Sequence, residues 1–186
     1  MKKRILELRR ENMNYLDKIK MSVDYIKKKY SGDLDIAIVL GSGLGGLGEM
    51  IENSIEIPYK DIPGFPLSTV EGHKGQLIIG KLGDKNIIAM QGRFHYYEGY
   101  PLNQVVFPIR VILGLGIENL IVTNAAGGVD KNFVPGDLML IEDHINFTGR
   151  NPLIGENLDE LGPRFVDMTS AYDKELMKLA IKQLKI

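Results

Sequence analysis

The residues of this chain best suited to chemistry are its histidines and an arginine in short, glycine-rich stretches. Residues 72–75 read Gly-His-Lys-Gly, and residues 92–95 read Gly-Arg-Phe-His. Arginine presents a planar fork of donors that fits phosphate, and histidine adds donors that are tunable near neutral pH. Two histidines and an arginine repel one another unless an anion lies between them. Together these side chains indicate an anion site, with phosphate as the best fit.

A predicted β-hairpin would bring the two stretches together. Residues 76–81 and 86–90 are apolar runs of strand length, and the four residues between them include Gly and Asp, which is typical of a tight turn. The two stretches flank the open ends of this hairpin. Antiparallel pairing therefore predicts that His73, Arg93 and His95 converge.

A metal site is the competing interpretation of the same histidines. His73, His95 and His144, with Asp143 beside the last, could supply a three-histidine set. None of them forms a local pair with typical ligand spacing, and Arg93 would repel a cation. We therefore expect no metal.

Glycine clusters follow two predicted buried strands. The first, at 41–48, holds five glycines in eight residues and follows an apolar run at 35–40. Its backbone N–H groups and the Ser42 hydroxyl would suit a phosphate. The second, at 123–128, adds small residues and the amide of Asn124 after another strand.

Two other phosphate-binding patterns fit the first cluster less well. It satisfies Gly-x-Gly-x-x-Gly, the dinucleotide fingerprint, but Pro58, Pro63 and Pro66 occupy the region where the second strand of that fold belongs. No Gly-Lys-Ser/Thr closes the loop, so a P-loop is disfavoured. Near the hairpin, Phe94 and Tyr96 are expected in the core, and a neighbouring tyrosine could close over a sugar.

The expected fold class is α/β, a twisted mixed β-sheet flanked by helices. We predict helices over 2–30, 47–53, 102–113 with a bend at Pro108, and 173–186, and strands over 35–40, 76–81, 86–90, 119–123 and 137–142, with irregular backbone at 58–66 and 146–167.

The composition excludes several classes of function. Lys and Arg number 23 and Asp and Glu 24, so the net charge is −1, and nothing in this balance favours nucleic acid or an anionic membrane. The absence of cysteine excludes disulfides and thiol chemistry and is consistent with a reducing compartment. No signal peptide or membrane-spanning run is predicted, so a cytoplasmic location is expected.

Taken together, these motifs resemble the trimeric class of purine nucleoside phosphorylases. The segments that carry the resemblance are 41–45 (Gly-Ser-Gly-Leu-Gly), 68–75 (Ser-Thr-Val-Glu-Gly-His-Lys-Gly), 91–101 (Gln-Gly-Arg-Phe-His-Tyr-Tyr-Glu-Gly-Tyr-Pro), 122–128 (Val-Thr-Asn-Ala-Ala-Gly-Gly), 143–146 (Asp-His-Ile-Asn) and 151–153 (Asn-Pro-Leu). The family transfers a pentose from a purine base to inorganic phosphate without a metal or organic cofactor. The resemblance thus implies a purine-salvage pentosyltransferase that uses phosphate as co-substrate.

The resemblance also implies roles for individual residues. It assigns phosphate to Ser42, His73, Arg93, His95 and the backbone N–H of Ala125, the nucleoside to Tyr97, Asn124 and Phe147, and catalysis to His95 and Arg93. Phe147 would cap the sugar in a neighbouring subunit of a homotrimer.

The family pattern continues beyond Ile186, to a purine-recognising Glu and Asn, a further phosphate-binding Ser and a ribose-contacting His. We therefore expect one domain, 1–186, incomplete at its C-terminus, with 1–12 as an N-terminal extension and no appreciable inosine phosphorolysis by itself. Two alternatives stay open: a methylthioadenosine phosphorylase-type enzyme, and a non-catalytic module that binds phosphate or another subunit.

Overall fold

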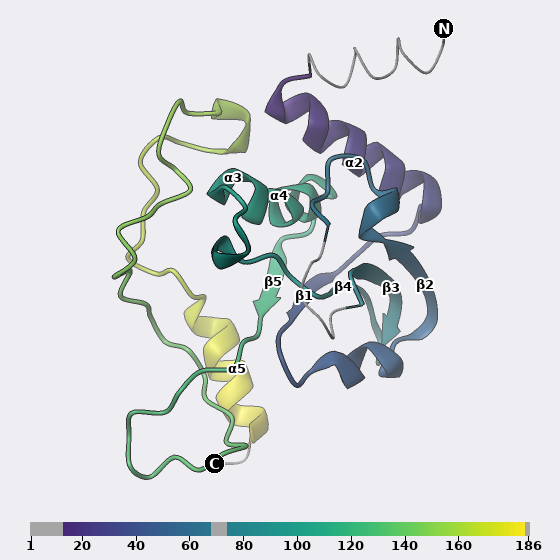
Figure 1. Ribbon diagram of the computed structural model, residues 1–186. Coiled ribbons are helices and arrows are strands. Elements are labelled where there is room, and N and C mark those ends of the chain that lie inside the picture. The colour runs from purple at the N-terminus through teal and green to yellow at the C-terminus, as the bar shows by residue number, and fades with distance from the viewer. Residues whose placement is uncertain (1–12, 68–73, 185–186) are drawn as a thin grey trace, which may run out of the picture. The chain divides into compact units, whose positions relative to one another are not determined.

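A five-stranded β-sheet lies at the centre of the first part of the chain (Figure 1). The computed structural model describes residues 13–67 and 74–184, and the chain divides into two units, Met1–Ala125 and Ala126–Ile186. The strands are β1 (Ile36–Leu40), β2 (Glu52–Pro58), β3 (Gln76–Leu82), β4 (Lys85–Gln91) and β5 (Asn119–Val122), in the spatial order β2-β3-β4-β1-β5.

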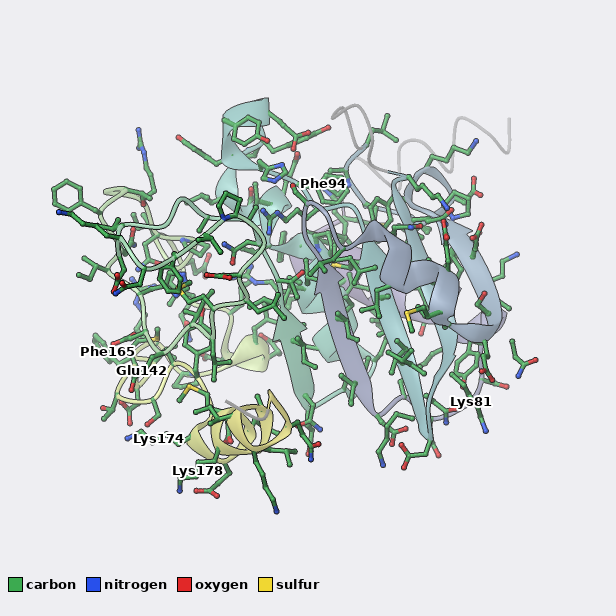
Figure 2. All side chains as sticks on the ribbon, turned by 90° about the horizontal axis from the view of Figure 1, so that it is seen from below. Lys81, Phe94, Glu142, Phe165, Lys174 and Lys178 are labelled. Atoms are coloured by element: carbon green, nitrogen blue, oxygen red, sulfur yellow. The ribbon has the colours of Figure 1, made fainter. Side chains whose placement is uncertain are left out.

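The strand directions bring three strand ends to one edge of the sheet. β1 runs parallel to both β4 and β5, with Leu40 opposite Gln91 and Val39 opposite Val122. Consequently β4, β1 and β5 end side by side, at what we call the carboxyl edge. β3 is antiparallel to β2 and β4, so the β3–β4 turn lies at the other end. Figure 2 shows this separation, with Lys81 near the turn and Phe94 at the carboxyl edge.

Two helices cover one face of the sheet. α2 (Tyr15–Lys29) begins where the Asn14 side chain accepts a hydrogen bond from the Asp17 N–H at 2.8 Å, which satisfies a free donor of the first turn. Ile19, Val23 and Ile26, three or four residues apart, form its buried stripe. This stripe packs against buried residues of α4 (Phe107–Gly114) and of the strands. The core on this face includes Ala37, Val39, Ile57, Leu77, Ile79, Ile88, Met90, Phe107, Val111 and Ile112.

The opposite face carries a smaller apolar cluster. Alternate β1 residues, Ile38 and Leu40, join Ile78 and Ile87 there. The 3₁₀ helix η1 (Gly45–Met50) contributes the half-buried Leu47 to it. β1 is thus buried on both faces, as its uninterrupted apolar sequence predicted.

The second unit is mostly irregular. It contains η4 (Asp159–Leu161) and α5 (Lys174–Leu184), and α5 confirms most of the helix predicted at 173–186. The predicted strand at 137–142 is wrong, since these residues adopt no regular structure and are largely exposed. An apolar run forms a strand only where another strand pairs with it, and local pattern does not supply that partner. No helix in the described ranges is long and apolar enough to cross a bilayer.

Three local predictions in the first unit also need correction. The predicted bent helix at 102–113 is two helices, α3 (Leu102–Val105) and α4, and Pro108 lies in the first turn of α4, where its missing N–H costs nothing. The helix predicted at 47–53 is η1 followed by β2, a strand that the sequence did not indicate. Tyr96 is 49% exposed, whereas Phe94 is in the core as expected.

Candidate functional site

The candidate site is built from three loops at the carboxyl edge. Gly41 and Ser42 follow β1, Arg93 follows β4, and Thr123 to Ala125 follow β5. Since β1 lies between the other two strands, the loop at Gly41 lies between the loops that carry Arg93 and Thr123. Ligands of α/β proteins bind outside the carboxyl ends of parallel strands, so this edge is where a site is expected.

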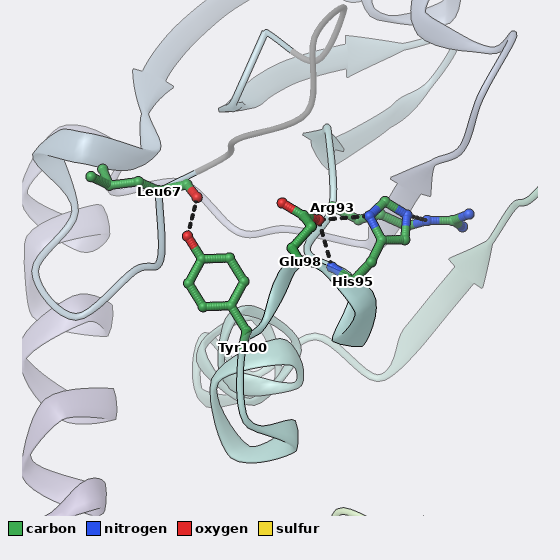
Figure 3. A network of polar contacts seen from close by, with 5 residues as sticks. All are labelled: Leu67, Arg93, His95, Glu98 and Tyr100. Carbon is green, nitrogen blue, oxygen red and sulfur yellow. Dashed lines mark hydrogen bonds and ion pairs between the residues drawn. The ribbon is translucent and has the colours of Figure 1, made fainter. Parts of the chain in front are cut away.

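A polar network links Arg93, His95 and Glu98 (Figure 3). The Arg93 Nε–H donates to His95 Nε2 at 3.0 Å, and His95 Nδ1 lies 2.7 Å from Glu98 Oε1. The same carboxylate oxygen accepts the His95 backbone N–H at 2.8 Å. Because an arginine Nε can only donate, Nε2 is the accepting nitrogen and the ring proton of the neutral imidazole lies on Nδ1.

Glu98 changes the electrostatic argument made from the sequence. Its side chain is only 3% exposed, and it pairs with the 19%-exposed side chain of His95. Arg93 and His95 therefore have a carboxylate partner within the protein and do not depend on a bound anion alone. Glu98 and His95 also form a reciprocal cap at the start of the 3₁₀ helix η3 (Tyr96–Glu98). The consequence is an imidazole held in one orientation beside the guanidinium.

The other end of Arg93 reaches across the site. Its Nη1 donates to the Thr123 carbonyl oxygen at 2.9 Å. On the solvent side, Tyr97 stacks on His95 with ring centroids 4.8 Å apart and planes at 18°, while Tyr97 itself is 76% exposed. An exposed aromatic face beside a polar network is suited to packing against a small ligand.

Buried polar side chains of the sheet region hydrogen-bond to the loops of the site. The Tyr59 hydroxyl donates to the Gly92 carbonyl at 2.6 Å, and burial raises the Tyr59 pKa above its ordinary value. Gln91, buried in the sheet, donates to the Gly45 carbonyl at 3.1 Å and accepts from Gln76 at 3.0 Å. These contacts connect β3, β4 and the glycine-rich loop, so the loop is tied to the sheet through side chains as well as through the chain.

The remaining predicted residues are distributed unevenly. Ser42, Asn124 and Ala125 are exposed at the carboxyl edge, and the Asn124 side-chain amide donates to the Ala125 carbonyl at 3.2 Å. His73 lies outside the described residues. Phe147 is 97% exposed and belongs to the second unit.

His144, the third histidine of the metal alternative, also belongs to the second unit. Its Nδ1 lies 2.8 Å from the Tyr172 hydroxyl. Within residues 13–67 and 74–184, no three His, Asp or Glu side chains cluster closely enough to hold a metal ion.

Sequence reasoning missed Glu98 and Thr123. Glu98 lies three residues after His95, a spacing that puts two side chains on one side of a helical turn, and this signal could have revealed it. Thr123 was identified only as the start of a small-residue stretch. Its contacts with residues 30 or more positions away have no local signal.

The site and fold place the chain among known proteins. Residues 35–186 match the pattern that defines the phosphorylase superfamily, and the chain belongs to this family. It is 57% identical over 162 residues to purine nucleoside phosphorylase 1 of Geobacillus stearothermophilus, and 56% identical over 169 residues to purine nucleoside phosphorylase 1 of Bacillus subtilis. These matches cover 87% and 91% of this chain but 59% and 62% of the two relatives.

A solved structure shows the same likeness. Isoform 2 of purine nucleoside phosphorylase from Schistosoma mansoni, in complex with cytosine and ribose-1-phosphate, superimposes with a TM-score of 0.83 and 48% sequence identity. The match covers 89% of this chain and 59% of that one. The mixed sheet flanked by helices is therefore the fold of this group.

Proposed function

We propose that this chain acts in purine nucleoside phosphorolysis, in which inorganic phosphate displaces the purine base and yields a pentose 1-phosphate. The observation that carries the proposal is the Arg93–His95–Glu98 network beside two glycine-containing loops at one edge of the sheet. The similarity to purine nucleoside phosphorylases supports the same reaction. The chain spans 59% of the length of the Geobacillus relative.

The geometry suits phosphate binding in energy as well as in charge. A millimolar dissociation constant requires only about 4 kcal/mol. Hydrogen bonds to charged groups contribute about 1.5–3 kcal/mol each, so two or three of them suffice after the cost of immobilising the ion. Arg93 would supply charged donors from the guanidinium N–H groups that bind neither His95 nor Thr123, and Ser42 and the Ala125 N–H would add neutral ones. His95, whose Nε2 accepts from Arg93, would orient that guanidinium toward the anion. His73 is proposed as a further donor.

The proposed reaction places the anion where positive charge develops. Breaking the bond between the pentose and the purine leaves an oxocarbenium-like sugar, and a phosphate held beneath its ring both attacks the anomeric carbon and stabilises the charge. In this proposal Arg93 holds the phosphate in that position, His95 orients the Arg93 guanidinium, and Glu98 holds the His95 ring. Tyr97 and Asn124 would contact the nucleoside. No step requires a metal or an organic cofactor.

The assembly and cellular setting follow as further parts of the proposal. A homotrimer would bring Phe147 of one subunit over the sugar site of its neighbour, and its 97% exposure leaves it accessible for such a contact. A role in purine salvage is proposed from the similarity to purine nucleoside phosphorylases. A cytoplasmic location without a nucleic-acid or membrane partner is proposed from the balanced charge and the cysteine-free composition.

Competition between two sugar phosphates tests the proposal. Ribose 1-phosphate and ribose 5-phosphate carry the same groups, but only the first has its phosphate on the anomeric carbon. Calorimetric titration of the 186-residue chain should show that ribose 1-phosphate binds more tightly than inorganic phosphate and competes with it. Ribose 5-phosphate should bind no better than phosphate. Equal affinity for the two sugar phosphates, or no binding of either, would overturn the proposal.

A further inference from the structure

Thr123 makes an unusual set of hydrogen bonds at the carboxyl edge. Its backbone N–H donates to the Val39 carbonyl at 3.1 Å, and its hydroxyl donates to the same carbonyl at 2.8 Å. The hydroxyl oxygen then accepts the Gly41 N–H at 2.7 Å. Finally, its carbonyl accepts from Arg93 Nη1 at 2.9 Å. One residue after β5 thus contacts both the loop after β1 and the arginine after β4.

These bonds replace one backbone hydrogen bond of the regular ladder between β1 and β5. β1 and β5 are parallel, and Val39 pairs with Val122, so the next pair along the ladder is Leu40 with Thr123. In a regular parallel ladder the Thr123 N–H would donate to the Val39 carbonyl, and the Gly41 N–H would donate to the Thr123 carbonyl. The first of these bonds is made. For the second, the Thr123 hydroxyl stands in for the carbonyl and leaves that carbonyl to accept from Arg93.

The glycine at position 41 makes this exchange of hydrogen-bond acceptors possible. A Cβ on Gly41 would lie 2.4 Å from the Thr123 carbonyl oxygen and 2.8 Å from its carbonyl carbon, which is closer than any real contact. The carbonyl that binds Arg93 therefore occupies the space that a side chain at position 41 would need. Gly41, Thr123 and Arg93 fit together as one unit across three strand ends.

We infer that Thr123 is a positioning residue for the proposed phosphate site, and that its hydroxyl is the group that matters. The hydroxyl fixes the backbone of the Gly41–Ser42 loop, and by occupying the Gly41 N–H it leaves the Thr123 carbonyl to the Arg93 guanidinium alone. Both sets of phosphate donors are then oriented before the anion arrives, which lowers the ordering cost of binding. This role rests on the proposed function, whereas the hydrogen bonds of Thr123 with Gly41 and Arg93 do not depend on it.

Two substitutions separate the hydroxyl from the bulk of the side chain. Thr123→Val keeps the shape and removes the hydroxyl, so the Gly41 N–H is expected to return to the Thr123 carbonyl as in a regular ladder. Arg93 must then share that oxygen with the Gly41 N–H and is held less tightly. Thr123→Ser keeps the hydroxyl. Thr169→Val is the matched control, because its hydroxyl bonds Asp167 at 2.6 Å in the second unit.

Nuclear magnetic resonance of the 186-residue chain reads the exchange directly through couplings across hydrogen bonds. In the wild type, a coupling from the Thr123 nitrogen to the Val39 carbonyl carbon is expected, and none from the Gly41 nitrogen to the Thr123 carbonyl carbon. In Thr123→Val the second coupling should appear and the Arg93 Nη1–H signal should shift. Thr123→Ser and Thr169→Val should match the wild type.

Titration with inorganic phosphate provides the functional readout. Thr123→Val should weaken phosphate binding about tenfold, through a weakened bond to a charged group, and Thr123→Ser should restore it to within about twofold. A Gly41-to-Thr123 coupling already present in the wild type overturns the inference even if the valine variant does not fold. So does an unchanged affinity in a folded Thr123→Val. If the wild type binds no phosphate, the proposed function fails, while the couplings still decide the role of the hydroxyl.

Discussion

The tight space beside Gly41 allows a demanding test of the site geometry. In Gly41→Ala the new Cβ would meet three backbone atoms: the oxygen and carbon of the Thr123 carbonyl and the Cα of Asn124, at 2.4, 2.8 and 2.9 Å. Backbone cannot rotate away as a flexible side chain can, so the ends of β1 and β5 must separate. The substitution should therefore disturb both the sheet edge and the Arg93 acceptor.

The size of the effect follows from three contributions. Overpacking of this kind costs about 1–3 kcal/mol. Weakening the bond between the Gly41 N–H and the Thr123 hydroxyl adds about 1 kcal/mol. The reduced entropy of the unfolded chain returns about 0.4–1 kcal/mol for a glycine-to-alanine change. We expect a net loss of about 1–4 kcal/mol in the free energy of unfolding, together with weaker phosphate binding.

Gly46→Ala is the matched control in the same loop. A Cβ on Gly46 would meet no atom within 4 Å, and its backbone φ lies outside the left-handed region. This variant should unfold at the same or a slightly higher urea concentration than the wild type, with the same phosphate affinity. Urea unfolding at constant m-value measures the difference. If Gly41→Ala proves as stable as Gly46→Ala, the close approach of Gly41 and Thr123 is wrong.

Two further predictions concern the supports of the site. Glu98→Ala removes the buried acceptor of the His95 backbone N–H and Nδ1 and should lower the free energy of unfolding in urea by about 1–3 kcal/mol. Glu98→Gln keeps an oxygen at that place and should lower it less. Equal losses in the two variants would contradict the role of that oxygen. Burial raises the Tyr59 pKa, so the unfolded chain ionises first and stability falls as the pH rises above about 10. Tyr59→Phe should show a shallower fall in unfolding free energy between about pH 9 and 11, and an equal slope would contradict this assignment.

Local sequence pattern was sufficient for the elements that are buried on both faces or closed by a clear turn. β1 is a short apolar run, and the β3–β4 hairpin is two such runs around Gly83, so both were predicted. β2 was missed because its first three residues are exposed, Asn53 has a φ of 50°, and its pairing shifts register. Its pattern is therefore not that of a regular half-buried strand.

The candidate site was predictable in its residue types and less so in its connections. Glycine, histidine and arginine pointed to an anion because their chemistry is local. The contacts of Arg93 with Thr123 and of Thr123 with Gly41 depend on β1 lying between β4 and β5, and strand order is a tertiary property. The burial of Glu98 is likewise set by packing, and only its spacing of three residues from His95 was visible in the sequence.

Titration of inorganic phosphate into the wild type, Arg93→Ala and Lys81→Ala tests the central claim most directly. Both variants remove one positive charge, but Lys81 lies near the β3–β4 turn, at the end of the sheet away from the site (Figure 2). Arg93→Ala should weaken phosphate binding by a factor of about 10 to 150, the equivalent of about 1.5–3 kcal/mol, and Lys81→Ala should leave it unchanged. Unaltered binding by Arg93→Ala, or an equal loss in Lys81→Ala, would contradict a phosphate site at the carboxyl edge.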